Sequence, residues 1–85
     1  MSAKFKKDYK LIKKHGYDTT LMEAVLDLLC ERQQLPPKYR NHTLTGNYEG
    51  HRECHITPDW LLIYKIEDDE LLLSLTRTGT HSDLF

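Results

Sequence analysis

The spacing of apolar residues changes near residue 50 of this 85-residue chain, and the change limits the folds that the chain can adopt. In the first half, Phe5, Tyr9 and Ile12 recur at the spacing of an amphipathic helix. In the second half, apolar residues alternate with polar ones or run together, as they do in strands. Helices followed by strands predict an α+β fold. We expect a helical hairpin over residues 4–34, packed on one face of a small antiparallel sheet.

Helix-ending and helix-starting residues divide the first half into two helices. Gly16 should end the first helix, because glycine tolerates the left-handed conformation that follows many helices. Thr20 and Glu23 fit a capping box at the start of the second helix. This helix should stop near Pro36, which cannot donate to the helical ladder. The apolar stripe expected on it comprises Leu21, Val25, Leu28 and Leu29.

The second half contains three expected strands. Residues 51–56 alternate, which places His51, Glu53 and His55 on one face and Arg52, Cys54 and Ile56 on the other. Residues 60–66 are apolar on both faces and predict a central strand. Residues 71–75 form the next strand. The expected connections are a loop over 38–50, a turn over 57–59, an acidic turn over 67–70, a break at Gly79 and a tail over 81–85.

Length and composition indicate a single domain over residues 1–85, with a net charge of −1. The first 15 residues hold six lysines and one acid, Asp8, so the chain has a basic end. The longest apolar run, residues 60–64, is far shorter than the ~20 residues of a membrane span. The lysines also leave no apolar signal core at the N-terminus. We expect a cytoplasmic protein with no membrane partner and with reduced thiols.

Two kinds of catalytic site are disfavoured by the strand pattern. His51, Cys54 and His55 resemble a cluster of metal ligands, but residues three apart on a strand point to opposite faces. Cys54 should face the helices, and Cys30 follows an apolar residue of the second helix, so both thiols should be inert packing groups. We therefore expect no metal and no cofactor.

A third set of residues suits the cleavage of RNA. Arg77 lies four residues before His81 across a glycine, and an arginine fork matches the geometry of a phosphate. Trp60 and Phe85 offer surfaces on which unpaired bases could stack. Histidines, an acid and an arginine can cleave a phosphodiester without a metal, because RNA supplies its own 2′-OH nucleophile. Composition alone leaves two alternatives open. The histidines could be exposed strand residues without a function, or the chain could be a plain nucleic-acid-binding module.

Three stretches of the chain together resemble the YafQ branch of the RelE/ParE toxin superfamily: residues 42–46, 52–64 and 77–85. The resemblance implies the RelE-like α+β fold and a bacterial type II toxin that cleaves messenger RNA, typically in the ribosomal A site. It implies three partners: a cognate antitoxin, the mRNA with its ribosome, and operator DNA bound only through the antitoxin complex.

The resemblance also assigns roles to individual residues. His81 and Asp59 would be the leading acid/base groups, and His42 and His55 would serve in acid/base work or phosphate contact. Arg77 would hold the scissile phosphate. The substrate-binding residues would be Trp60 and Phe85. The alternative is a non-catalytic toxin of the ParE type that binds a protein target, although such relatives lack the polar ending found at residues 77–81.

Overall fold

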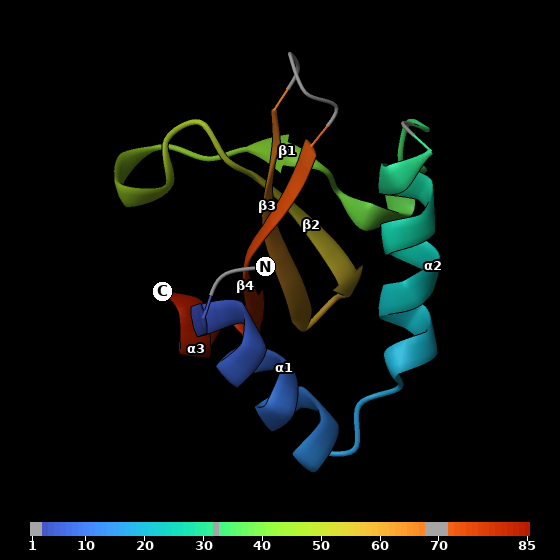
Figure 1. Cartoon of the computed structure of the whole chain (residues 1–85), viewed down its shortest axis with the longest axis vertical. Coiled ribbons are helices and arrows are strands. Elements are labelled where there is room, and N and C mark those ends of the chain that lie inside the picture. The colour runs from blue at the N-terminus through green and yellow to red at the C-terminus, as the bar shows by residue number, and fades with distance from the viewer. Residues whose placement is uncertain (1–2, 32, 68–71) are drawn as a thin grey trace.

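The computed structural model describes residues 3–31, 33–67 and 72–85. Its helices are α1 (Ala3–Lys14), α2 (Thr19–Cys30) and α3 (His81–Leu84), with 3₁₀ turns η1 (Pro37–Tyr39) and η2 (Gly46–Tyr48). Its strands are β1 (His42–Thr43), β2 (Arg52–Thr57), β3 (Trp60–Glu67) and β4 (Leu72–Gly79). Figure 1 shows α1 and α2 lying against the sheet, and the predicted α+β fold is confirmed.

The sheet has the order β1-β2-β3-β4, and each neighbouring pair is antiparallel. β3 lies between β2 and β4, which confirms the central strand predicted over residues 60–66. β1 falls inside the expected loop, because two residues are too few for an alternating pattern to show. β4 is longer than the expected strand over 71–75, since pairing with β3 continues to Gly79. The acidic turn expected over 67–70 lies mostly outside the described residues.

α1 packs against β4 and α2 against β2, so the two helices cover one face of the sheet (Figure 1). The core between these layers contains Phe5 and Ile12 from α1, Met22, Val25 and Leu29 from α2, and Cys54, Ile56, Trp60, Leu62 and Tyr64 from β2 and β3. The predicted stripe on α2 is wrong at Leu21, which is 42% exposed. The inward position belongs to its neighbour Met22, because Met22, Val25 and Leu29 share one face of the helix.

The first helix ends as expected, but the second helix has different limits. Gly16 takes the left-handed conformation just beyond α1, with φ of +80°. α2 is capped by Asp18, whose carboxylate accepts hydrogen bonds from the backbone N–H and the hydroxyl of Thr20 at 3.0 and 2.6 Å. The predicted capping box at Thr20 is therefore wrong by two residues. α2 also ends at Cys30, well before Pro36, so a non-helical segment leads to η1.

The opposite face of β3 is covered by two short segments. Leu61 and Ile63 point to this face and pack with Leu84 of α3, and with Leu44 and Tyr48 near η2. The expected tail over residues 81–85 is therefore largely helical. A capping box fixes α3, because the Thr80 hydroxyl accepts from the backbone of Asp83 while the Asp83 carboxylate accepts from the backbone of Thr80. Burial on both faces explains why β3 is apolar throughout.

The pairing of β3 with β4 shifts by one residue at a bulge. Tyr64 pairs with Leu75, but Ile63 pairs with Arg77, so Thr76 is an additional residue in β4. Directly paired residues share a face of a sheet. Arg77 therefore starts on the face of Ile63, and its side chain reaches Asp8 of α1 at the edge of β4. Strict alternation from Leu75 would have turned Arg77 toward the helices, so the bulge determines where this arginine points.

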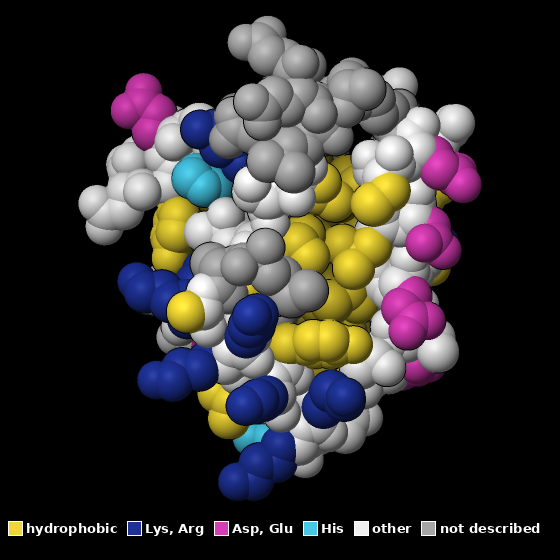
Figure 2. All heavy atoms as spheres, viewed as in Figure 1, with side chains coloured by type: hydrophobic (Ala, Val, Ile, Leu, Met, Phe, Trp, Pro, Cys, Tyr) yellow, Lys and Arg dark blue, Asp and Glu magenta, His cyan; other side chains and the backbone are white. Residues whose placement is uncertain are grey.

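Charged side chains are segregated on the helical side of the molecule. Figure 2 shows lysine side chains over α1 and acidic side chains along α2, with apolar side chains between them. The lysines of α1 are Lys4, Lys6, Lys7, Lys10, Lys13 and Lys14, and the acids of α2 and its C-cap are Glu23, Asp27 and Glu31. Within the described ranges, no helix is both long and apolar enough to cross a membrane.

Candidate active site

Two histidines and a buried carboxylate meet on the face of the sheet that α1 and α2 leave uncovered. His42 of β1 pairs with Glu53 of β2, and His55 lies two residues further along the same strand. One oxygen of Glu53, Oε1, is 3.4 Å from Nε2 of His42 and 3.6 Å from Nε2 of His55. The side chains of this His42–Glu53–His55 cluster come together because β-strand residues two apart share a face. Glu53 is only 5% exposed, so its charge acts in a poorly hydrated setting.

Backbone carbonyls orient both histidine rings of this cluster. Nδ1 of His42 lies 2.8 Å from the carbonyl oxygen of Arg40, and Nδ1 of His55 lies 3.3 Å from that of Pro58. A carbonyl oxygen can only accept, so Nδ1 carries the proton in each ring. Nε2 is then the nitrogen that can take up or release a proton, and it faces Glu53. Protonation at Nε2 would add an ionic attraction to Glu53 in each contact.

Arg77 occupies the same face through the bulge in β4 and is held by a carboxylate from α1. Its Nε donates to Asp8 Oδ2 at 2.7 Å and its Nη2 donates to Asp8 Oδ1 at 3.1 Å. The pKa of Arg77 is raised, chiefly by the hydrogen bond to Asp8 and further by the hydroxyl of Tyr48, against an opposing effect of burial. The charged guanidinium is thus fixed at the edge of β4, one strand away from Glu53 along the row Glu53–Ile63–Arg77.

Aromatic rings from three segments gather near the chain end. The ring centroid of Phe85 lies 5.0 Å from that of His81 and 5.9 Å from that of Tyr48, which in turn lies 6.1 Å from His51. Phe85 is 56% exposed and presents a ring on which a base could stack. Gly79 permits the tight corner into α3, because a Cβ there would lie 3.3 Å from Cβ of Asp83.

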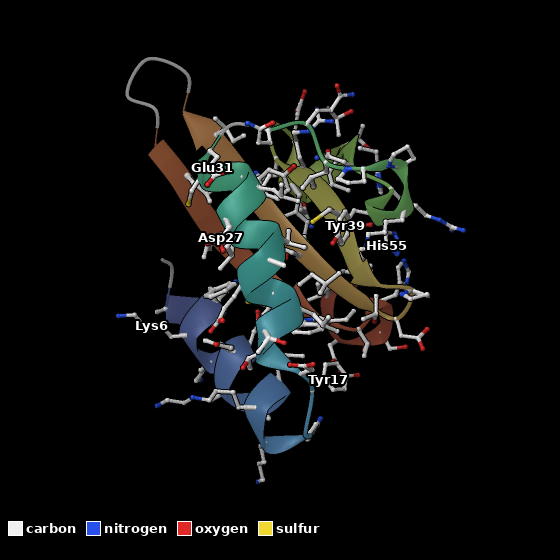
Figure 3. All side chains as sticks on the ribbon, turned by 90° about the vertical axis from the view of Figure 1, so that its right-hand side faces the viewer. Lys6, Tyr17, Asp27, Glu31, Tyr39 and His55 are labelled. Carbon is white, nitrogen blue, oxygen red and sulfur yellow. The ribbon has the colours of Figure 1, made fainter. Side chains whose placement is uncertain are left out.

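Of two further residues named from sequence, Asp59 lies near His55 and Lys6 lies far from it. Asp59 lies exposed in the turn between β2 and β3, next to the Pro58 carbonyl that orients His55. In Figure 3, His55 and Lys6 lie on opposite sides of the molecule, so this lysine does not border the His42–Glu53–His55 cluster.

Trp60 requires a correction. Its side chain is 1% exposed and belongs to the core under the helices, where it packs edge-on against Tyr17 at 5.3 Å. Its indole N–H donates to the Thr78 hydroxyl at 2.8 Å, and that hydroxyl donates to the carbonyl of Leu61. The predicted stacking of Trp60 on RNA is therefore wrong, since its ring faces the opposite side of the sheet from His55.

Three residues of the site were not assigned a role from sequence: Asp8, Tyr48 and Glu53. Glu53 shares the strand face of His51 and His55, so its position was predictable while its double contact was not. Tyr48 lies in the segment expected to be a loop. Asp8 stands among lysines on a helix and gives no sequence signal, because its partners lie about 70 positions away.

The two thiols differ from each other. Burial, with a smaller effect from the charge of Glu53, raises the pKa of Cys54 to about 12, so Cys54 is an inert core thiol as predicted. Cys30 is exposed, contrary to the prediction, because its position on α2 points away from the sheet. No group of three or more histidine, cysteine or acidic side chains placed to hold a metal occurs in the described part of the chain.

Comparison with known proteins identifies relatives over the whole chain. Residues 1–85 match the family model described as bacterial toxin of type II toxin–antitoxin system, YafQ. The chain is 41% identical over 85 residues to the mRNA interferase toxin YafQ of Escherichia coli K12, covering 99% of this chain and 90% of that protein. Its expected resemblance to this family is thereby confirmed.

Solved structures share the fold at similar identity. The toxin fold of the E. coli DinJ–YafQ complex matches with a TM-score of 0.90 and 41% identity, covering 99% of this chain and 92% of that one. A metal-bound toxin from Helicobacter pylori matches with a TM-score of 0.91 and 46% identity, covering 99% and 93%. Family model, sequence identity and fold agree over the full length, and the chain therefore belongs to the YafQ family of bacterial toxins from type II toxin–antitoxin systems.

Proposed function

We propose that this chain is an endoribonuclease that cleaves messenger RNA as the toxin of a toxin–antitoxin pair. The observation that carries the proposal is the placement of the His42–Glu53–His55 cluster and Arg77 on the face of the sheet that bears Ile63. The E. coli relative is named an mRNA interferase, which agrees with this chemistry. Proton-transfer groups beside a fixed guanidinium are what phosphodiester cleavage through the 2′-OH needs.

The proposed reaction uses the nucleophile that RNA carries. A basic group removes the proton of the 2′-OH, whose oxygen attacks the adjacent phosphorus. The bond from phosphorus to the 5′-oxygen then breaks, and an acidic group gives its proton to that oxygen. His81, Asp59 and the histidines of the cluster are the candidate acid and base, and Arg77 stabilises the charge on the crowded phosphorane. Phe85 stacks on a base of the RNA.

The partners follow from the same family. A cognate antitoxin binds the toxin, as DinJ is found with YafQ in the E. coli complex. The row of lysines on α1 suits an acidic segment of such a partner, because complementary charge speeds association. We propose further that cleavage occurs on translating ribosomes in the cytoplasm, and that operator DNA is contacted only through the antitoxin.

Mapping the RNA ends tests the proposal. A defined mRNA, free or being translated in a purified translation mixture, should yield a 5′-OH and a 2′,3′-cyclic phosphate or its 3′-phosphate product. A 2′-O-methyl group at the scissile nucleotide should abolish the cut, and the unmodified transcript is the control. Protein dialysed against EDTA beforehand should cut as fast as untreated protein.

Two results would contradict the proposal. Full cleavage of the 2′-O-methyl transcript would exclude attack by the 2′-OH. Growth arrest without any new RNA ends would favour the ParE-like alternative, in which the toxin binds a protein target.

A further inference from the structure

Asp8 is a buried carboxylate on a helix whose other charged residues are lysines. It is 8% exposed, and it accepts three hydrogen bonds from β4. Two come from Nε and Nη2 of Arg77, and the third comes from the backbone N–H of Thr78 at 3.1 Å. β4 is the last strand of the sheet, so this N–H lies on its open edge. One side chain of α1 therefore fixes both the edge of β4 and the arginine beside it.

The geometry of this contact leaves part of the guanidinium free to act. A bidentate carboxylate fixes the plane of the guanidinium as well as its position. Nε and one N–H of Nη2 are engaged by Asp8, whereas Nη1 belongs to the side of the fork that Asp8 does not bind. The N–H groups that Asp8 does not engage can donate to a phosphate, beside or in place of the Tyr48 hydroxyl, without releasing Asp8. The arginine is thus oriented before RNA binds, which lowers the entropic cost of ordering its side chain on binding.

A second chain of contacts continues from Thr78 into the core. The Thr78 hydroxyl accepts from the indole of Trp60 and donates to the carbonyl of Leu61. Asp8 and Trp60 therefore hold Thr78 from its backbone and its side chain, and Thr78 adjoins Arg77 in sequence. This arrangement restricts the backbone that carries the arginine, beyond restricting the side chain itself.

We infer that Asp8 is a positioning residue for catalysis, which holds the Arg77 guanidinium in the orientation that engages the scissile phosphate. The inference rests on the proposed function, because it requires Arg77 to act on RNA. Asp8 itself does not touch the substrate. Its contribution is to hold the guanidinium in one position at the edge of β4 in the resting protein.

The test compares Asp8→Asn with Arg77→Ala and the double variant. Asparagine keeps the shape but loses the charge and turns an N–H₂ group toward the arginine, so it cannot accept both guanidinium bonds. Single-turnover cleavage per folded molecule should fall by up to ~10²-fold in Asp8→Asn, as expected for a misplaced catalytic group. Arg77→Ala should lose ~10²–10³-fold. Adding Asp8→Asn to Arg77→Ala should cost nothing further. Asp27→Asn, an exposed acid on α2, is the matched control and should cleave normally.

A measurement on the unmodified protein covers the case in which Asp8→Asn does not fold. The Nε–H of Arg77 should exchange with solvent more slowly than that of exposed Arg40, when followed by ¹⁵N NMR. Its signal should persist when a 2′-O-methyl RNA binds, because Asp8 keeps that bond.

Four outcomes would overturn the inference. One is a lower melting temperature in Asp8→Asn with an unchanged rate per folded molecule, which makes Asp8 purely structural. A second is an equal loss in the presence and absence of Arg77, and a third is fast exchange at Nε. The fourth is full activity in Arg77→Ala, which would overturn the inference together with the proposed role of Arg77. It is the one outcome among the four that also contradicts part of the proposed function.

Discussion

His81 is an exposed histidine at the start of α3, with its ring against that of Phe85. Because an exposed side chain adds little to the core, His81→Ala should leave the melting temperature nearly unchanged. The same variant should lower the rate of RNA cleavage by ~10²–10⁴-fold, as the loss of one proton-transfer group does. Single-turnover cleavage of a defined transcript measures the rate. Ser82→Ala, at the neighbouring exposed position, is the control; full activity in His81→Ala would show that the acid/base group lies elsewhere.

The two cysteines should differ sharply in reactivity. Cys30 is exposed, whereas burial keeps the Cys54 thiol protonated, with its pKa raised to about 12. At pH 8 an alkylating reagent should modify Cys30 alone in the folded protein and both cysteines in denaturant, as counted by mass spectrometry. Equal labelling rates in the folded protein would contradict the buried position of Cys54.

The same pKa shift makes stability depend on pH. The folded pKa of Cys54 lies above the ~8.5 of a free thiol. Burial of the neutral thiol therefore contributes stability that is fully present below about pH 8.5, and this contribution is lost as the pH rises from there toward 12.

At the scale of single residues, the sequence identifies residue types better than it identifies their surroundings. His42, His55 and Arg77 start on the same face of the sheet, and their catalytic roles stay predictions. Trp60 lies on the other face, because an aromatic residue suits a core and a stacking platform equally well. Asp8 could not be found from sequence, since its importance depends on pairing with a strand from the far end of the chain.

Helix α1 permits a prediction about association with the antitoxin. Neutralising Lys6, Lys10, Lys13 and Lys14 to glutamine should slow association by ~10-fold or more at low salt and weaken its salt dependence. Dissociation should change little, because these lysines are exposed. Stopped-flow or surface-based kinetics with the cognate antitoxin measures both rates.

A control of opposite charge comes from the other helix. Neutralising Glu23, Asp27 and Glu31 removes charges of the opposite sign from α2 and its C-cap, and it should not slow association with an acidic segment. If the lysine and acid variants behave alike, electrostatic attraction to α1 does not guide the encounter.

At the scale of elements, periodicity predicted what is long and regular. α1, β2 and β3 appear close to their expected positions, since each carries a repeated apolar pattern. β1 and α3 were not predicted, because two and four residues hold only about one period each, too little for a repeat to show. The start of α2 was misplaced since Asp18 and Thr20 are both good caps, and the backbone entering the helix decided between them.

At the scale of the whole molecule, the change of period near residue 50 predicted the order of layers correctly. The apolar character of β3 on both faces predicted its central place, and it also indicated that something must cover the second face. What covers it, α3 with the segment around Leu44 and Tyr48, follows from long-range packing rather than local pattern. The His42–Glu53–His55 cluster lies on this second face, on β1 and β2, and Arg77 starts on it from β4.

The additional residue at Thr76 makes the length of β4 as important as its composition. A substitution in this strand changes one side chain, whereas loss of a single codon between Leu75 and Arg77 would restore strict alternation. Arg77 would then turn inward and Thr78 outward, away from Asp8 and Trp60. Many substitutions should consequently be tolerated in this strand. In-frame deletions should be removed by selection. Scanning by deletion would detect this constraint, which scanning by substitution cannot.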